Sequence, residues 1–94
     1  MSRGRFDEVI HAPNRLRICA FLSPLEESEF SVLRDEIGVS DSVLSKHVSQ
    51  LVNAGYVKLR KHAVDGRQRT WAALSPQGRR AFASHIVALQ ELVG

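Results

Sequence analysis

The stretch of residues 40–56 constrains the fold of this 94-residue chain more than any other. Ser40 is a residue type that caps helix N-termini, and Gly55 is one that ends helices. Between them, apolar residues recur at helical spacing, at Leu44, Val48, Leu51 and Val52. A helix with such a stripe must bury it against another element. The sequence therefore predicts a capped helix from about 41 to 54 that packs on one side and is exposed on the other.

The exposed side of this helix has an unusual composition. A merely solvated face would carry long acid–base pairs, whereas this one carries short hydroxyls and a single cation. The residues in question are Ser42, Ser45, Lys46 and Ser49, and Ser40 opens the same surface. Serine and lysine can donate hydrogen bonds to base edges or phosphates. We therefore expect this face to enter the major groove of DNA, with an ordinary solvated face as the alternative.

A second helix is predicted just before this one. Ser31 can cap a helix over Val32–Ile37, in which Leu33 and Ile37 share a face. Gly38 then suits a left-handed stop. Two helices joined by three or four residues that include a glycine are typical of a helix-turn-helix, here over about 31–54.

The segment after the helix-turn-helix predicts a basic hairpin over about 56–74. Val57 and Leu59 alternate with basic residues, as in a half-buried strand. Asp65-Gly66 is a dipeptide that favours hairpin turns, and residues 68–74 supply the returning strand. Arg67 and Arg69 stand near the predicted tip, where contact with DNA is favoured over simple exposure. The cations of residues 58–61 are explained equally well by protection of an edge strand.

Helices are also predicted on both sides of this unit. A short helix over residues 6–11 precedes a helix that begins near Pro13 and ends before Ser23-Pro24. Phe30 is expected to be a buried anchor in a very short strand. Ser75-Pro76 opens a last helix over about 76–93.

The positive charge is concentrated in the middle of the chain. Residues 40–70 hold six Lys and Arg against two Asp and Glu, whereas residues 1–39 hold five against seven. The net charge of the whole chain is only +3. A polyanionic partner addressed by the middle third is the natural inference.

Several classes of protein are disfavoured by the composition. The single cysteine, Cys19, excludes an internal disulfide framework, and no stretch has the length of a membrane span. The four histidines match no compact zinc spacing, and no catalytic constellation is present. We therefore expect one cytoplasmic domain over residues 1–94 without a signal peptide, membrane contact, metal, cofactor or enzymatic activity.

Taken in order, these segments resemble the winged-helix transcriptional regulators of the MarR and ArsR type, in their small single-domain form. The resemblance covers about 65 residues. Its motifs are Pro13-Asn14-Arg15-Leu16-Arg17-Ile18, Phe30-Ser31-x-Leu33, Leu44-Ser45-Lys46-His47-Val48-x-x-Leu51-x-x-Ala54-Gly55-Tyr56-Val57, Asp65-Gly66-Arg67 with Arg69 and Thr70, and Leu74-Ser75-Pro76-x-Gly78-Arg79. The paired cysteines of the ArsR metal motif and the C-terminal extension of MarR proteins have no counterpart.

The resemblance implies a homodimer that binds a palindromic operator and represses transcription. It places Ser42, Val43, Ser45, Lys46 and Ser49 at the recognition-helix positions that face the major groove. It places Arg67 and Arg69 at the wing positions that reach the minor groove or its phosphates.

The last helix provides the predicted dimer interface. A long terminal helix on a small domain exposes more apolar surface than one fold can cover, so we expect it to pair with its copy together with residues 6–11. The predicted interface residues are Phe6, Val9, Ile10, Phe82, Ile86, Leu89 and Val93. Two-fold symmetry would then place the half-sites about 34 Å apart.

The sequence thus predicts an α+β fold that is mainly α with a small β-hairpin: a winged helix-turn-helix in the order helix, helix, short strand, helix, helix, hairpin, helix. The predicted function is that of a sequence-specific regulator of double-stranded DNA. Two alternatives stay open, since fold does not determine function. One is a winged helix used for protein–protein interaction, and the other is a regulator of the same fold that senses a small-molecule effector or a redox signal.

Overall fold

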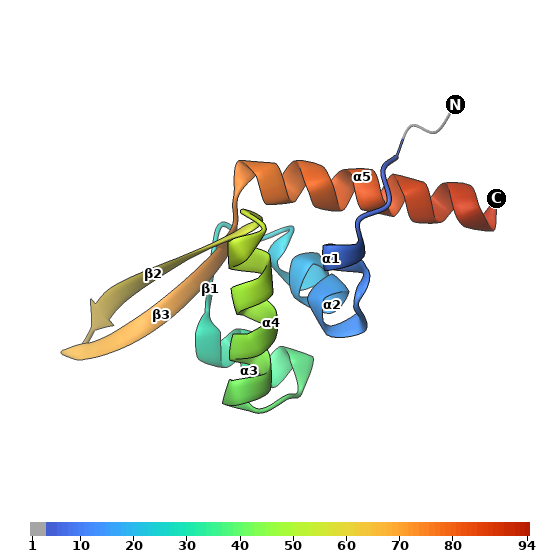
Figure 1. Ribbon diagram of the computed structural model, residues 1–94. Helices are drawn as coiled ribbons and strands as arrows, with labels where there is room; N and C mark the ends of the chain where they lie inside the picture. The colour runs from blue at the N-terminus through green and yellow to red at the C-terminus, as the bar shows by residue number, and fades with distance from the viewer. Residues whose placement is uncertain (1–3) are drawn as a thin grey trace.

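The computed structural model describes residues 4–94 and confirms a mainly helical winged helix-turn-helix with a three-stranded antiparallel sheet (Figure 1). The elements, in chain order, are α1 (Glu8–His11), α2 (Pro13–Leu22), β1 (Ser28–Glu29), α3 (Phe30–Ile37), α4 (Asp41–Asn53), β2 (Val57–Val64), β3 (Arg67–Leu74) and α5 (Pro76–Val93).

The helix-turn-helix forms through the predicted turn chemistry. Gly38 ends α3 in the left-handed conformation, with φ of 78°. Ser40 then caps α4, because its side-chain oxygen accepts a hydrogen bond from the N–H of Val43 at 3.2 Å. Only one residue, Val39, separates the glycine from the cap, so the connection between α3 and α4 is short.

The predicted start of α3 is wrong by two residues. Glu29, and not Ser31, occupies the N-cap position, and Phe30 is the first helical residue. The reason is the pairing of β1 with β3, which keeps the chain extended through Glu29. Ser31 lies inside the first turn instead, and its hydroxyl donates to Oε1 of Glu29 at 3.1 Å.

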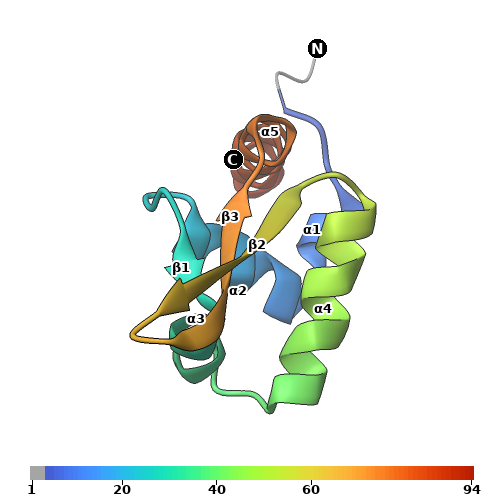
Figure 2. The ribbon, with the colours of Figure 1, turned by 90° about the vertical axis from the view of Figure 1, so that its left-hand side faces the viewer.

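The wing is a regular antiparallel hairpin, in register from Val57 opposite Leu74 to Val64 opposite Arg67. Its turn residues, Asp65 and Gly66, both have positive φ, of 50° and 76°. Such a turn matches the twist of the strands that it joins. In Figure 2, β1 and α4 lie on opposite sides of this hairpin.

The predicted half-buried character holds for only the first part of β2. Val57 is buried, but Leu59 is 46% exposed, and residues 60–63 beyond it are exposed as well. Only the base of the hairpin, at Val57, Ala72 and Leu74, packs on the core. The rest of its length extends away from the domain and has no core to face. The wing therefore projects into solvent (Figure 1).

The core lies around α2 and is formed by side chains of the helices α1 to α4 and of the strands β2 and β3. Its fully buried side chains are Ile10, Ile18, Cys19, Leu22, Leu33, Leu44 and Leu51, joined by buried Ile37, Val48, Val57, Ala72 and Leu74. Ile10 corrects a prediction. Its exposed fraction is 0% within the single chain, so it has no surface to give to a dimer partner.

The last helix, α5, crosses the domain and extends well beyond it (Figure 1), which makes the molecule elongated at 52 × 24 × 21 Å. Ser75 caps this helix, as predicted, by accepting the N–H of Gly78 at 2.9 Å. Its most buried residues are Gly78, His85 and Ala88. The predicted stripe lies beside this inner face and is therefore only partly covered by the chain itself.

None of the helices in residues 4–94 combines the length and the apolar character needed to cross a membrane.

Candidate nucleic-acid interface

The outward face of α4 carries the predicted groove-facing side chains. Leu44, Val48 and Leu51 are buried on its inner side. The outer side exposes Ser42, Val43, Ser45, Lys46 and Ser49. The structure therefore brings these five residues together on one surface, which has small polar side chains, one methyl-bearing side chain and one cation.

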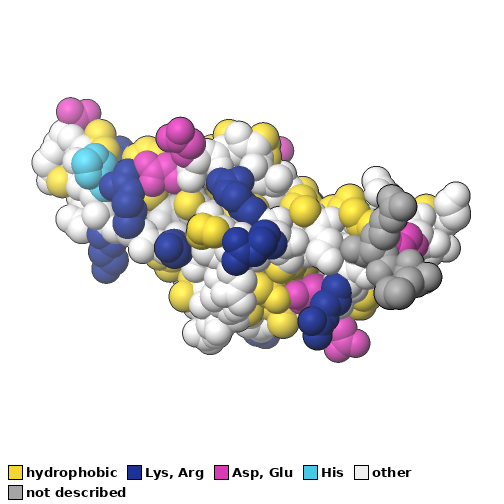
Figure 3. All heavy atoms as spheres, turned by 90° about the horizontal axis from the view of Figure 1, so that it is seen from above, with side chains coloured by type: hydrophobic (Ala, Val, Ile, Leu, Met, Phe, Trp, Pro, Cys, Tyr) yellow, Lys and Arg dark blue, Asp and Glu magenta, His cyan; other side chains and the backbone are white. Residues whose placement is uncertain are grey.

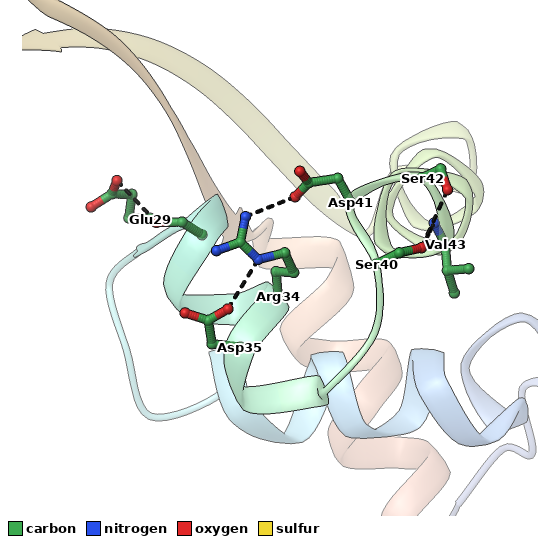
Figure 4. Close-up of polar contacts among 8 residues, drawn as sticks. Glu29, Arg34, Asp35, Ser40, Asp41, Ser42 and Val43 are labelled. Carbon is green, nitrogen blue, oxygen red and sulfur yellow. Dashed lines mark hydrogen bonds and ion pairs between the residues drawn. The ribbon is translucent and has the colours of Figure 1, made fainter.

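The start of α4 is rigidly attached to α3 by Arg34 (Figure 4). Its Nη1 lies 3.0 Å from Oδ1 of Asp41, and its Nε lies 3.0 Å from Oδ1 of Asp35. These hydrogen bonds to Asp35 and Asp41 raise the pKa of the arginine. Arg34 thus balances the negative charge of Asp41, which would otherwise repel phosphates beside the predicted groove surface. The sequence reasoning did not identify this residue.

Ser40 has two roles at the same helix end. Its oxygen caps α4 and lies 3.2 Å from the hydroxyl of Ser42. Both hydroxyls are exposed, so they form a small polar cluster at the N-terminus of α4 (Figure 4). Exposed donors and the partial positive charge of a helix N-terminus both favour phosphate oxygens.

The inner side of α4 is held by a polar contact with α2. Nη1 of Arg15 lies 3.3 Å from Nδ1 of His47, and Nε of Arg15 donates to the carbonyl oxygen of Val9. Burial, and then the charges of Arg15 and Lys46, lower the pKa of His47. The prediction that His47 packs beside the recognition helix with a polar partner is confirmed.

The two wing arginines have different surroundings. Arg67 is exposed and directly follows the turn, opposite Val64. Arg69 lies closer to the body of the protein and forms an ion pair with Glu29, at the junction of β1 and α3. The structure therefore leaves Arg67 accessible at the tip, whereas Arg69 already has a partner within the chain.

The distribution of surface charge separates two regions of the molecule. Seen from above α5, Lys and Arg side chains lie over the wing and the beginning of this helix, whereas its far half shows mostly apolar and uncharged atoms (Figure 3). The sequence has no Lys or Arg after Arg80. A polyanion is therefore favoured on the side of the molecule that carries the wing.

A second polar cluster joins the N-terminal segment to α5. Asp7 caps α1 by accepting the N–H groups of Val9 and Ile10, and its other carboxylate oxygen accepts the hydroxyl of Tyr56. Its own N–H donates to the buried His85. A hollow of about 600 Å³ lies beside this cluster, between residues 5–9 and α5, and is separate from the exposed face of α4.

Cys19 has no redox chemistry open to it in this fold. The side chain is fully buried, and burial raises the pKa of its thiol to about 12. Because the thiolate is the reactive form, such a thiol is inert at neutral pH. This agrees with the expectation that Cys19 is a core residue and argues against a redox-sensing regulator.

The family of winged-helix DNA-binding domains matches residues 14–93. The chain belongs to this family. The match includes both helices of the helix-turn-helix, the wing and α5. This winged-helix protein is thus of the transcriptional-regulator type, which is a non-enzymatic class. Solved regulators of the MarR and ArsR families share its fold, which confirms the resemblance seen in the sequence.

Individual relatives of this winged-helix domain are moderately distant. An uncharacterised protein of Methanocaldococcus jannaschii is 29% identical over 85 residues, which are 90% of this chain and 92% of the relative. The structure of a transcriptional regulator homologue from Pyrococcus horikoshii OT3 matches with a TM-score of 0.87 and 25% identity, over 93% of this chain and 86% of that one.

A third structure is similar in fold alone. It is the homodimeric winged helix-turn-helix domain of a possible ArsR-family regulator from Mycobacterium bovis. Its TM-score is 0.74 at 20% identity, over 92% of this chain and 76% of that chain.

Proposed function

We propose that the protein is a homodimeric, sequence-specific repressor that binds a palindromic operator in double-stranded DNA. In this proposal α4 enters the major groove through Ser42, Val43, Ser45, Lys46 and Ser49. Ser40 at its N-terminus and Arg67 at the wing tip contact flanking phosphates or the minor groove. Bound at a promoter, a dimer of this size would occlude it without a catalytic step.

The observation that carries the proposal is the exposed face of α4. It combines donors that suit base edges and phosphates with side chains short enough for the helix backbone to approach the groove floor. A helix fits into the major groove, and the hairpin beside it reaches the adjoining backbone. The family of DNA-binding domains to which the chain belongs supports the same assignment.

The dimer is supported by apolar surface at the end of α5. Leu92 is 73% exposed and Val93 is 87% exposed, and Phe6 is exposed nearby. Ile86 and Leu89 on the same helix are partly buried within the single chain. Phe82 of α5 and Val9 of α1, which lie nearer the core, are partly buried as well. A second copy of α5 would cover this surface, as large exposed apolar side chains require. The Mycobacterium bovis domain of the same fold is described as homodimeric.

The experiment that tests this function begins with selection of binding sites from a random pool of duplexes. Fluorescence anisotropy then measures the affinity of the selected duplex for the wild type, Lys46→Ala, Arg67→Ala and Arg80→Ala. We expect Lys46→Ala and Arg67→Ala to weaken binding about tenfold each, since charged contacts to DNA contribute about 1–3 kcal/mol. Arg80→Ala removes the same charge from α5 and should change affinity little.

The salt dependence of the affinity distinguishes DNA recognition from the protein-interaction alternative. Each phosphate contact should contribute about −0.9 to the slope of log affinity against log salt concentration. A selection that enriches no duplex, or equal affinities for all four proteins, would overturn the proposal. The first of these outcomes would favour the protein-interaction alternative for the exposed face of α4.

A further inference from the structure

We propose that Glu29 and Arg69 form a positioning pair that sets the angle of the wing for DNA binding, so that an acidic residue beside the DNA surface increases affinity for DNA. The proposal rests on the proposed function, because it concerns how the wing is presented to DNA. It replaces the expectation that Arg69 itself contacts DNA.

The wing is attached to the body of the domain by few strand pairs. The third strand, β1, pairs with β3 only at Ser28 opposite Ala72 and at Glu29 opposite Trp71. Beyond this point β2 and β3 continue for four further residue pairs, from Lys61 opposite Thr70 to Val64 opposite Arg67, with only each other as neighbours in the sheet. Main-chain hydrogen bonds alone therefore leave the outer hairpin free to swing about the Trp71 pair.

The contact between Glu29 and Arg69 lies on the outer side of that pivot. Arg69 is two residues further out on β3 than Trp71, and its Nη1 binds Oε1 of Glu29. The side chain of Arg69 is 39% exposed and that of Glu29 is 21% exposed, so water screens the pair only in part. The hydrogen bond from Arg69 holds the pKa of Glu29 below its usual range, and the glutamate is ionised at neutral pH.

Glu29 is itself fixed to the helix-turn-helix. It occupies the N-cap position of α3, and its Oε1 also accepts the hydroxyl of Ser31 in the first turn of that helix. A movement of the wing would therefore stretch a bond to α3, which Arg34 in turn connects to α4. The pair thus couples the position of the Arg67 tip to the position of the recognition helix.

A second ion pair supports the same face of the sheet. The register places Glu29, Trp71 and Arg60 in one row across the three strands, so their side chains project from one face. The guanidinium of Arg60 lies 5.7 Å from the centre of the Trp71 ring, and its Nε lies 2.8 Å from Oε2 of Glu27. Both glutamates precede α3, and each holds one strand of the wing.

The proposal reverses the expectation from charge alone. Removing an acidic residue near a polyanion normally tightens binding, because repulsion of phosphates is lost. If Glu29 positions the wing, Glu29→Ala weakens binding instead. If Arg69 contacts DNA and Glu29 merely competes for it, Glu29→Ala tightens binding and Arg69→Ala weakens it.

A double-mutant cycle on the selected duplex separates these outcomes. We expect Glu29→Ala and Arg69→Ala to weaken binding about tenfold each, as loss of a charge-assisted hydrogen bond allows, and the double variant to be no weaker than either single one. Glu29→Gln, which keeps the acceptor for Ser31, should also weaken binding. The exchanged pair, Glu29→Arg with Arg69→Glu, should recover affinity relative to its two single variants.

The matched control is Glu26→Ala, which removes an exposed carboxylate from the same connection and should leave affinity unchanged or tighter. Thermal unfolding of each variant shows whether the domain is folded. Binding by Glu29→Ala and Glu29→Gln as tight as wild type, or tighter, would overturn the positioning role while leaving the DNA-binding function intact. Failure of the wild type itself to select DNA would count against the proposed function instead.

Discussion

The backbone N–H of Asp7 donates a hydrogen bond to Nδ1 of the buried His85 at 2.9 Å. Because Nδ1 accepts, the proton of a neutral His85 ring must be on Nε2, which lies 3.2 Å from Nδ1 of His11. Protonation of His85 would place two N–H groups against each other at Asp7. The contact between the N-terminal segment and α5 therefore requires a neutral imidazole.

This contact predicts that stability falls in mild acid. Burial, and then the neighbouring His11, lower the pKa of His85 in the folded protein, whereas Asp7 acts in the opposite direction. The unfolded chain, with a histidine pKa of about 6.5, then binds the proton first. The contribution of His85 to stability is complete above about pH 6.5 and is lost as the pH falls below that value.

Urea unfolding between pH 5 and pH 8 measures this effect. The wild type should lose stability below about pH 6.5, and we expect this loss to be smaller in His85→Gln. His47→Gln is the matched control, because the pKa of His47 is also lowered in the folded protein. This variant should still show the loss of stability in acid that His85 causes. The same pH dependence in wild type and His85→Gln would contradict the interpretation.

Replacement of two glycines by alanine should lower the free energy of unfolding by different amounts. At Gly38 an added Cβ meets nothing within 4 Å, so Gly38→Ala suffers only from φ of 78°, which costs about 1 kcal/mol. At Gly78 the added Cβ would lie 2.0 Å from the carbonyl oxygen of Tyr56, a backbone atom that cannot move aside. We expect Gly78→Ala to cost about 3 kcal/mol, through displacement of α5.

Denaturant unfolding of both glycine variants measures these free energies. Equal losses for Gly38→Ala and Gly78→Ala would show that α5 does not approach the end of α4 as closely as the structure has it.

The apolar end of α5 predicts how the dimer can be dissociated. Leu92→Glu would bury an unpaired charge in the proposed interface, at a cost of about 3 kcal/mol, while leaving the folded monomer unstrained because Leu92 is exposed. Gln90→Glu adds the same charge on the same helix and should remain dimeric. Sedimentation velocity decides the matter, and a dimeric Leu92→Glu would place the interface elsewhere.

Local chemistry explains which parts of the fold could be predicted. Gly38, Ser40 and the Asp65-Gly66 turn act through their own backbone and nearest neighbours, so the sequence alone places them correctly. The stripe of α4 was predictable for the same reason, since Leu44, Val48 and Leu51 follow the helical period.

The errors all involve contacts between distant segments. The cap of α3 moves from Ser31 to Glu29 because β1 pairs with β3, about 43 residues away in the chain. Ile10 is in the core and His85 on the inner face of α5 because of how the short N-terminal helix docks, and the apolar period of α5 did not reveal this. The partner of Arg69 was likewise invisible, because it comes from that same unpredicted strand pairing.

The claim that the face of α4 and the tip of the wing bind DNA is tested most directly by mapping the surface that DNA covers. Amide NMR spectra of the protein with and without the selected duplex provide that map. We expect the largest shifts in the first half of α4, from Ser40 to Ser49, and at the wing tip around Arg67, with little change in the outer half of α5. Shifts confined to α5 and the N-terminal segment, with α4 unaffected, would contradict the account.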